Sequence, residues 1–125
     1  MTGYIFRCTA KTKPEVYERM LLGEEPGLWG HVSKIQSDDI LFLYNTSTFE
    51  ITGPLKPDGE PGNPVEKGAW KGGFTSQIKF AETEDTKTIP FAKIQHIIKK
   101  YRHGLYPEMV LDARQVEAIL EILSN

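Results

Sequence analysis

Hydrophobic residues recur in this chain with two spacings, one typical of strands and one typical of helices. An unbroken apolar run at residues 40–44 ends on Asn45, and a second β-prone run follows at 49–53 after a polar turn. This pattern predicts a hairpin spanning residues 40–55, with its first strand buried. Residues 4–9 predict a short strand, and 74–80 predict another because apolar and polar residues alternate there.

Three segments carry the helical spacing. The first helix is expected at 14–22, with Pro14 in its first turn and Gly23 as its stop signal. A second, amphipathic helix is expected at 91–101. Asp112 is expected to cap a last helix, whose buried stripe would be Val116, Ile119, Leu120 and Leu123.

Glycine, proline and charged residues separate these elements. Residues 24–30 hold one proline and two glycines, and residues 57–73 hold three prolines and five glycines, so both are predicted to be loops. A charged turn is expected at 82–87. Trp29 and Trp70 both fall in the predicted loops, which are unusual places for large apolar rings. The order β-α-β-β-β-α-α predicts an α+β domain, residues 1–125, built around a small, mostly antiparallel β-barrel.

Composition narrows the range of functions. A chain of 125 residues with a net charge of −2 is expected to be one domain, and its charge excludes a broadly basic protein that coats nucleic acid. The single cysteine, Cys8, lies in an apolar strand and predicts a buried, inert thiol. We see no signal peptide and no apolar run long enough to span a membrane, so we expect a cytoplasmic protein without a membrane partner.

Several short motifs resemble, in their order and spacing, the development and cell death (DCD) domain. They are Gly3-Tyr4-Ile5-Phe6, Leu41-Phe42-Leu43-Tyr44-Asn45, Ile51-Thr52-Gly53, Ala69-Trp70 and Phe74-x-x-Gln77-Ile78, followed by Pro107-Glu108-Met109-Val110-Leu111 and a closing helix at 115–123. DCD is similar in turn to the EVE, YTH and ASCH domains of the PUA-like group. The resemblance implies a PUA-like barrel of about five or six strands with about three flanking helices. For YTH and EVE relatives it also implies a pocket for a modified base extruded from a nucleic acid.

The stretch Leu28-Trp29-Gly30-His31-Val32 lies where EVE domains carry a tryptophan-containing segment that lines this pocket. Ser33 and Lys34 then replace the arginine and asparagine of the EVE pattern. The EVE-type contacts are therefore in question in this chain, whereas the resemblance still implies the fold.

A pocket that binds a base needs aromatic faces for stacking and polar groups for the base edge. The base-pocket candidates combine both kinds of residue and are Trp29, Gly30, His31, Val32, Tyr44, Asn45, Ser47 and Trp70. Each has a structural alternative. For Tyr44, and for Phe49 as a further aromatic candidate, the alternative is a place in the core of the hairpin. For Asn45 the alternative is a role in forming the turn. For the two tryptophans it is to seal the barrel beneath the long loops.

Basic residues concentrate between Lys93 and His103. Lys99, Lys100 and Arg102 are the candidate phosphate contacts, and the alternative is the solvated face of the amphipathic helix. The three histidines have no metal-ligand spacing, and no catalytic triad or phosphate loop is recognisable, so we expect no metal, no cofactor and no catalytic residues.

Three functions follow from these patterns. The leading hypothesis is a noncatalytic module that binds RNA or DNA and holds a base, plain or modified, in an aromatic pocket. The alternative is a protein-interaction domain of the DCD type that uses the 57–73 loop as its surface for a protein partner or for a second copy of itself. The weaker alternative is a nucleoside-directed enzyme like some ASCH relatives.

Overall fold

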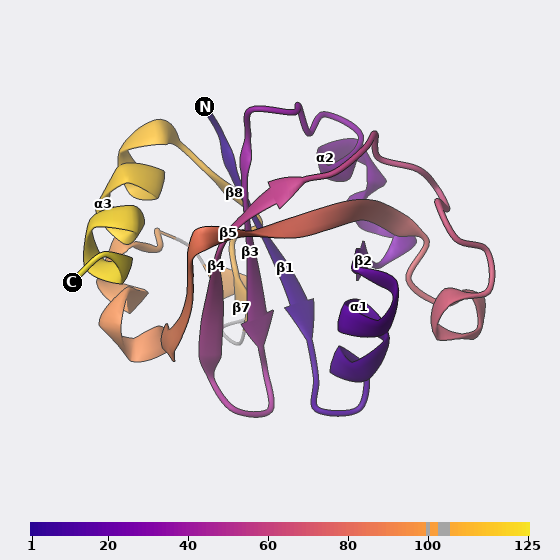
Figure 1. Ribbon diagram of the computed structural model, residues 1–125, viewed down its shortest axis with the longest axis horizontal. Helices are drawn as coiled ribbons and strands as arrows, with labels where there is room; N and C mark the ends of the chain where they lie inside the picture. Colours follow the sequence, from indigo (N-terminus) through magenta and orange to yellow (C-terminus); the bar gives the residue numbers. More distant parts are fainter. Residues whose placement is uncertain (100, 103–105) are drawn as a thin grey trace.

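The computed structural model describes residues 1–99, 101–102 and 106–125, and its ribbon is shown in Figure 1. The strands are β1 (Gly3–Cys8), β2 (Leu21–Glu24), β3 (Ile40–Asn45), β4 (Glu50–Pro57), β5 (Ser76–Pro90), β6 (Tyr101–Arg102), β7 (Tyr106–Pro107) and β8 (Val110–Leu111). The α-helices are α1 (Lys13–Arg19), α2 (Trp29–Val32) and α3 (Ala113–Leu123). Short 3₁₀ turns lie at Pro26–Leu28, Ala69–Gly72, Phe91–Lys93 and Gln95–Ile97.

Among the described residues, six strands form one curled sheet in the order β2-β5-β4-β3-β1-β8. β1 and β3 run parallel, and the other neighbours run antiparallel. The 15-residue strand β5 turns the sheet, because its first half pairs with β2 and its second half pairs with β4. The expected fold class, a small and mostly antiparallel barrel of about five or six strands with about three flanking helices, is confirmed, with the six-stranded sheet curled into a half-barrel.

Both faces of the central strands are buried, which explains why β3 is an unbroken apolar run. Alternate residues point to opposite sides of a strand. Phe6, Leu41 and Leu43 therefore join one cluster with Val16 and Val32, residues of α1 and α2. Ile5, Phe42 and Tyr44 join the second cluster, with Ile94 and Val116 among its members. Figure 1 shows α3 and the turns after β5 on one side of the sheet, with α1 and α2 on the other.

The prediction for residues 14–24 was partly wrong. Helix α1 ends at Arg19, because Met20 adopts a left-handed conformation at φ 49° and its N–H donates to the Val16 carbonyl. The chain then re-enters the sheet as β2. Gly23, expected to stop the helix, instead lies inside β2, where a Cβ would come within 2.4 Å of a Trp70 ring carbon.

Three other local predictions need correction. The helix expected at 91–101 is replaced by the two 3₁₀ turns after β5, although Ile94 and Ile98 are buried as predicted. The charged turn at 82–87 lies inside β5, where the pairing with β4 slips between Gly53 and Leu55. Trp29 begins the short helix α2 and is not in a loop. The segment predicted as a turn at 82–87 and the loop predicted around Trp29 thus form regular structure in the folded domain.

Candidate functional site

The edge strands of the curled sheet are β2 and β8, but β8 pairs only with Gly3 and Tyr4 of β1, and the rest of β1 lies near β2. Among the described residues, no ladder hydrogen bonds join β1 to β2. The gap between them is spanned by side chains. The Arg7 guanidinium donates from Nε to Glu24 Oε2 at 2.9 Å and from Nη2 to Glu24 Oε1 at 2.7 Å. The Arg7 backbone N–H also donates to Glu24 Oε2, at 3.0 Å. We call this place the seam, because a bidentate ion pair joins β1 to β2 there, whereas backbone hydrogen bonds join the other neighbouring strands.

A cavity of about 160 Å³ opens at the seam. It is lined by the end of β1 and the loop after it, the end of β2, the turn after β3 and the segment before β5. The lining residues are Arg7, Cys8, Thr9, Thr12, Glu24, Glu25, Thr46 and Phe74. Sites for drug-sized ligands are typically about 300–1,000 Å³, so this seam cavity suits one small planar group.

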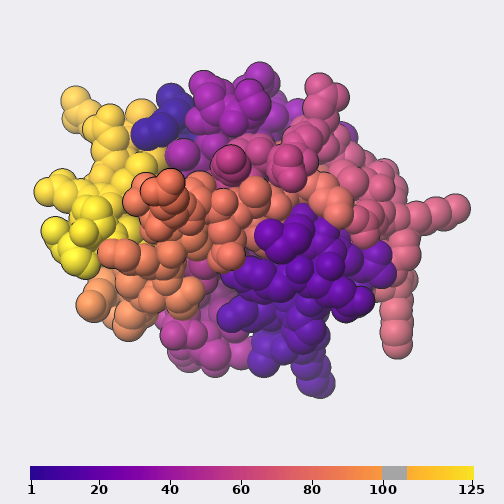
Figure 2. All heavy atoms as spheres, in the orientation of Figure 1, coloured from indigo at the N-terminus to yellow at the C-terminus, as the bar shows by residue number. Residues whose placement is uncertain are grey.

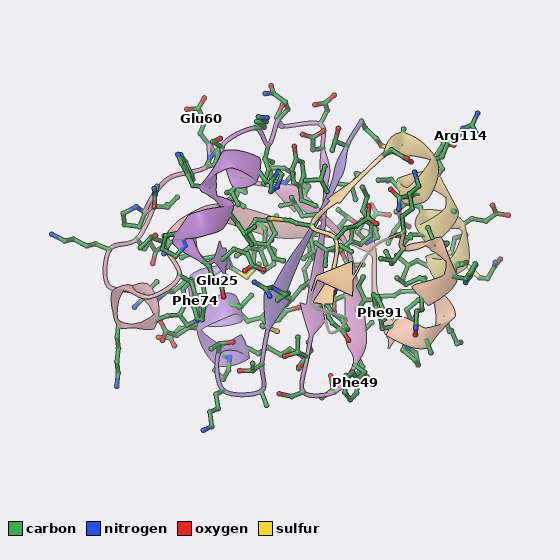
Figure 3. The ribbon with its side chains drawn as sticks, turned by 180° about the vertical axis from the view of Figure 1, so that it is seen from behind. Glu25, Phe49, Glu60, Phe74, Phe91 and Arg114 are labelled. Atoms are coloured by element: carbon green, nitrogen blue, oxygen red, sulfur yellow. The ribbon has the colours of Figure 1, made fainter. Side chains whose placement is uncertain are left out.

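The aromatic wall of the seam cavity is Phe74, and Trp70 supports it from behind. The two rings meet edge to face, with centroids 5.8 Å apart and an interplanar angle of 76°. Trp70 is held in turn by its indole N–H, which donates to the Thr12 carbonyl at 3.1 Å, and by its backbone N–H, which donates to Glu15 Oε2 at 2.8 Å. Phe74 and Glu25 lie side by side in Figure 3 and both line the seam cavity.

Three threonines, Thr9, Thr12 and Thr46, add hydroxyls to the polar lining of the seam cavity. Thr46 Oγ1 donates to the Cys8 carbonyl at 3.2 Å, and Thr12 Oγ1 accepts from the Thr9 N–H at 2.9 Å. The single Thr46 hydroxyl proton is used in its bond to the Cys8 carbonyl, so Thr46 Oγ1 can accept a hydrogen bond from a donor on a base edge. Cys8 is no nucleophile here, because burial raises the pKa of its thiol to about 11.

The candidates on α2 lie away from the seam cavity. Trp29 is half-buried against the core and lines a separate polar hollow of about 510 Å³. Val32 is fully buried, and Gly30 and His31 are exposed. We call this second space the Trp29 hollow, and its other lining residues are Ser33, Ile35, Gln36, Ser37, Gly59, Glu60 and Pro61.

The candidates around the hairpin turn have structural tasks. Tyr44 is 4% exposed and stacks on Phe91 with centroids 4.5 Å apart, so its ring belongs to the core. Asn45 Oδ1 accepts from the backbone N–H groups of Ser47 and Thr48, as the turn-former interpretation predicted. Ser47 Oγ accepts from the Ala10 N–H at 2.9 Å. Phe49 contradicts its core interpretation, because it is 65% exposed.

The structure describes only part of the predicted phosphate site. Lys99 Nζ pairs with Asp112 Oδ2 at 2.7 Å, and this contact holds the pKa of the Asp112 carboxyl below its usual range. Lys100 lies outside the described residues, as does the side chain of Arg102. Closer to the seam cavity are Lys11, exposed in the loop between Thr9 and Thr12, and Lys13, whose charge acts on Cys8.

Sequence reasoning missed most of the residues at the seam. Arg7 and Glu24 were not recognised because β2 was not predicted, and without it nothing places residue 24 beside residue 7. Phe74 was quoted only as part of a motif. The signal available was Arg7, a charged residue inside the apolar segment of β1, which predicts a buried partner of opposite charge.

The long 57–73 loop is fastened to the sheet. Gln77 Oε1 accepts from the backbone N–H groups of Val65 and Glu66, at 2.9 and 2.8 Å. The Glu66 carboxylate pairs with Lys79 and Arg19, and these hydrogen bonds lower its pKa. These bonds hold the loop against the sheet, and the loop in turn positions Trp70 and the adjacent Phe74.

Within the described parts of the chain, no cluster of three or more histidine, cysteine or acidic side chains could hold a metal ion. In the same residues, no helix has the length and apolar character needed to cross a bilayer.

A profile of the Development and cell death domain matches residues 2–123. The chain therefore belongs to the DCD domain family. Two curated relatives are each 35% identical to this DCD domain over 69 residues, which is 55% of the chain. They are the DCD domain-containing protein NRP-B of Glycine max and the B2 protein of Daucus carota. The aligned segment spans only 21% and 33% of those two proteins.

Solved YTH domains share the fold of this DCD domain. A complex of the YTH domain-containing protein mmi1 with RNA has a TM-score of 0.70 at 11% identity, and the match covers 98% of this chain and 80% of that one. The Pho92 YTH domain in complex with m6A also has a TM-score of 0.70, at 8% identity, over 99% and 86% of the two chains. At such identities the likeness shows the fold alone.

Proposed function

We propose that this DCD domain binds single-stranded nucleic acid and that the seam cavity accepts one base of the strand. The observation that carries the proposal is the composition of the seam cavity, where a supported aromatic ring faces threonine hydroxyls in a space suited to one planar group. Stacking on an aromatic ring is worth about 1–3 kcal/mol per base and offsets much of the cost of unstacking it. The fold shared with RNA-binding YTH domains supports the same function.

The charges of the seam cavity favour bases that carry an exocyclic amine. Glu25 lies at the opening, with its side chain 52% exposed. A carboxylate accepts hydrogen bonds from amino groups such as the cytosine N4 amine. Adenine, cytosine, guanine and their amine-methylated forms are therefore the preferred candidates, with the methyl group against the Phe74 ring.

Fluorescence anisotropy of labelled oligonucleotides tests the proposal. The panel consists of short single-stranded RNA and DNA, unmodified and base-methylated, at low and physiological salt. Phe74→Ala removes the aromatic wall and should weaken binding by about 5- to 150-fold, the equivalent of one lost stacking contact. Trp29→Ala is the matched control at a ring outside the seam cavity and should leave the affinity unchanged.

Each alternative gives a different result. Loss of binding in Trp29→Ala but not in Phe74→Ala would place the base in the Trp29 hollow and contradict the seam assignment. Binding that every variant retains and that salt abolishes would reduce the activity to generic phosphate contacts. A wild-type domain that binds no oligonucleotide would contradict the proposed function and favour the protein-interaction alternative.

A further inference from the structure

Phe49 is the most exposed large hydrophobic side chain among the described residues, with 65% of its surface accessible. It occupies the tip of the β3–β4 hairpin, where Figure 3 shows its ring pointing away from the sheet. A single exposed apolar residue is common on protein surfaces and by itself indicates nothing. The backbone at this position provides a second observation.

Phe49 has a φ of 57°, in the left-handed region that bulky side chains rarely occupy. The turn imposes this conformation, because the Phe49 N–H donates to the Asn45 carbonyl and the Phe49 carbonyl accepts from the Phe91 N–H, both at 2.8 Å. Glycine or asparagine would adopt it with less strain. The ring buries little surface in return, so the fold gives no reason for phenylalanine at this position.

The hairpin turn connects Phe49 with the seam cavity. Thr46, three residues earlier in the same turn, lines that cavity. Ser47 ties the turn to the loop after β1 by accepting a hydrogen bond from the Ala10 N–H. Asn45 Oδ1 fixes the turn from inside. The ring is therefore presented on a braced turn, and the first residue of that turn, Thr46, lines the proposed base site.

We propose that Phe49 is a stacking platform for a second nucleotide of the strand whose other base occupies the seam cavity. The inference rests on the proposed function and extends it from one base to a short single strand. Exposed aromatic rings on braced supports are how single-strand binders hold bases without reading their sequence. A strand that leaves the seam cavity past Thr46 and Ser47 would run toward Phe49, and the ring would add affinity without base preference.

Three variants of Phe49 and two ligands test this inference. Phe49→Gly removes both the ring and the strain, Phe49→Ala removes the ring but keeps the strained backbone, and Phe49→Trp keeps a stacking face. The ligands are a pentanucleotide and the matching single nucleoside. We expect Phe49→Gly and Phe49→Ala to bind the pentanucleotide about 5- to 150-fold more weakly than wild type. Phe49→Trp should bind it as tightly as wild type, and all variants should bind the nucleoside equally.

Thermal unfolding supplies the structural control. Phe49→Gly should melt at the same temperature as wild type or higher, because strain is relieved and little packing is lost. A lower melting temperature would mean that the ring stabilises the fold, and the stacking role would be overturned. Unchanged affinity of Phe49→Gly for the pentanucleotide would also overturn the stacking role of Phe49. In that case the proposed function would still stand if Phe74→Ala weakened binding. A wild-type domain that binds neither the pentanucleotide nor the nucleoside would contradict both the stacking role of Phe49 and the proposed function.

Discussion

Replacing Glu24 by glutamine removes the charge that holds the seam while keeping the shape of the side chain. The Glu24 carboxylate is 3% exposed and accepts four hydrogen bonds, three from Arg7 and one from the Glu25 N–H at 3.3 Å. Glutamine offers one acceptor oxygen, and its amide would point N–H groups at the Arg7 guanidinium. The variant therefore leaves the charged Arg7 guanidinium in the seam with only some of its hydrogen bonds satisfied.

The size of the effect follows from the burial of the pair. Removing one partner of a buried ion pair typically costs about 3–5 kcal/mol. The Arg7 side chain keeps 16% of its surface in water, so we expect the lower end of that range, about 3 kcal/mol, for Glu24→Gln. A loss of this size is a large fraction of the roughly 5–15 kcal/mol that holds a typical domain folded.

Urea unfolding followed by circular dichroism measures this loss, with Glu25→Gln as the matched control. The Glu25 carboxylate is 52% exposed and lies 3.8 Å from Arg7 Nη2, so its replacement should cost less than about 1 kcal/mol. If Glu24→Gln destabilised the domain no more than Glu25→Gln does, the ion pair would not be what joins β1 to β2. The description of the seam would then be wrong.

Three further outcomes are expected. Gly23→Ala should lower stability by about 1–3 kcal/mol and shift the tryptophan emission, because the new Cβ would meet a Trp70 carbon at 2.4 Å; an unchanged spectrum would contradict this packing. Cys8 should react with a thiol reagent near pH 8 about 100-fold more slowly in the folded domain than after unfolding, because its pKa rises from 9.0 to about 11; equal rates would show an open thiol. Lys99→Gln should raise the pKa of Asp112, measured by NMR titration, because Lys99 donates to that carboxylate. The Asp112 contribution to stability is present above the unfolded carboxyl pKa and is lost as the pH falls through the folded value, so the variant should lose part of that low-pH dependence and keep the part that the Gln115 N–H supplies.

Much of the fold was predictable because the strongest patterns are also the most buried. The apolar run of β3 and the Asp112-capped stripe of α3 were identified correctly, and the capping box of Asp112 with Gln115 is present. β2 was missed because Leu21 and Leu22 continue the helical spacing of α1. The left-handed Met20 that separates the two elements has no sequence signal, since glycine is the residue expected at such a position.

The site was less predictable than the fold. Its parts come from β1, β2, the turn after β3 and the segment before β5, and only the folded sheet brings them together. The sequence drew attention to the tryptophans, and Trp70 does brace the aromatic wall. The wall itself is Phe74, whose role depends on the Trp70 contact and on Gly23, which leaves room for the indole.

The measurement that tests the account most directly is a two-dimensional amide NMR titration of the assigned wild-type domain with an amine-bearing nucleoside. We predict that the largest shift changes fall on the residues lining the seam cavity, among them Thr9, Thr12, Thr46 and Phe74. Changes centred instead on Ser33, Gln36 and Gly59 would place the ligand in the Trp29 hollow. Either that result or the absence of any saturable change would contradict the claim that the seam between β1 and β2 is a base-binding site.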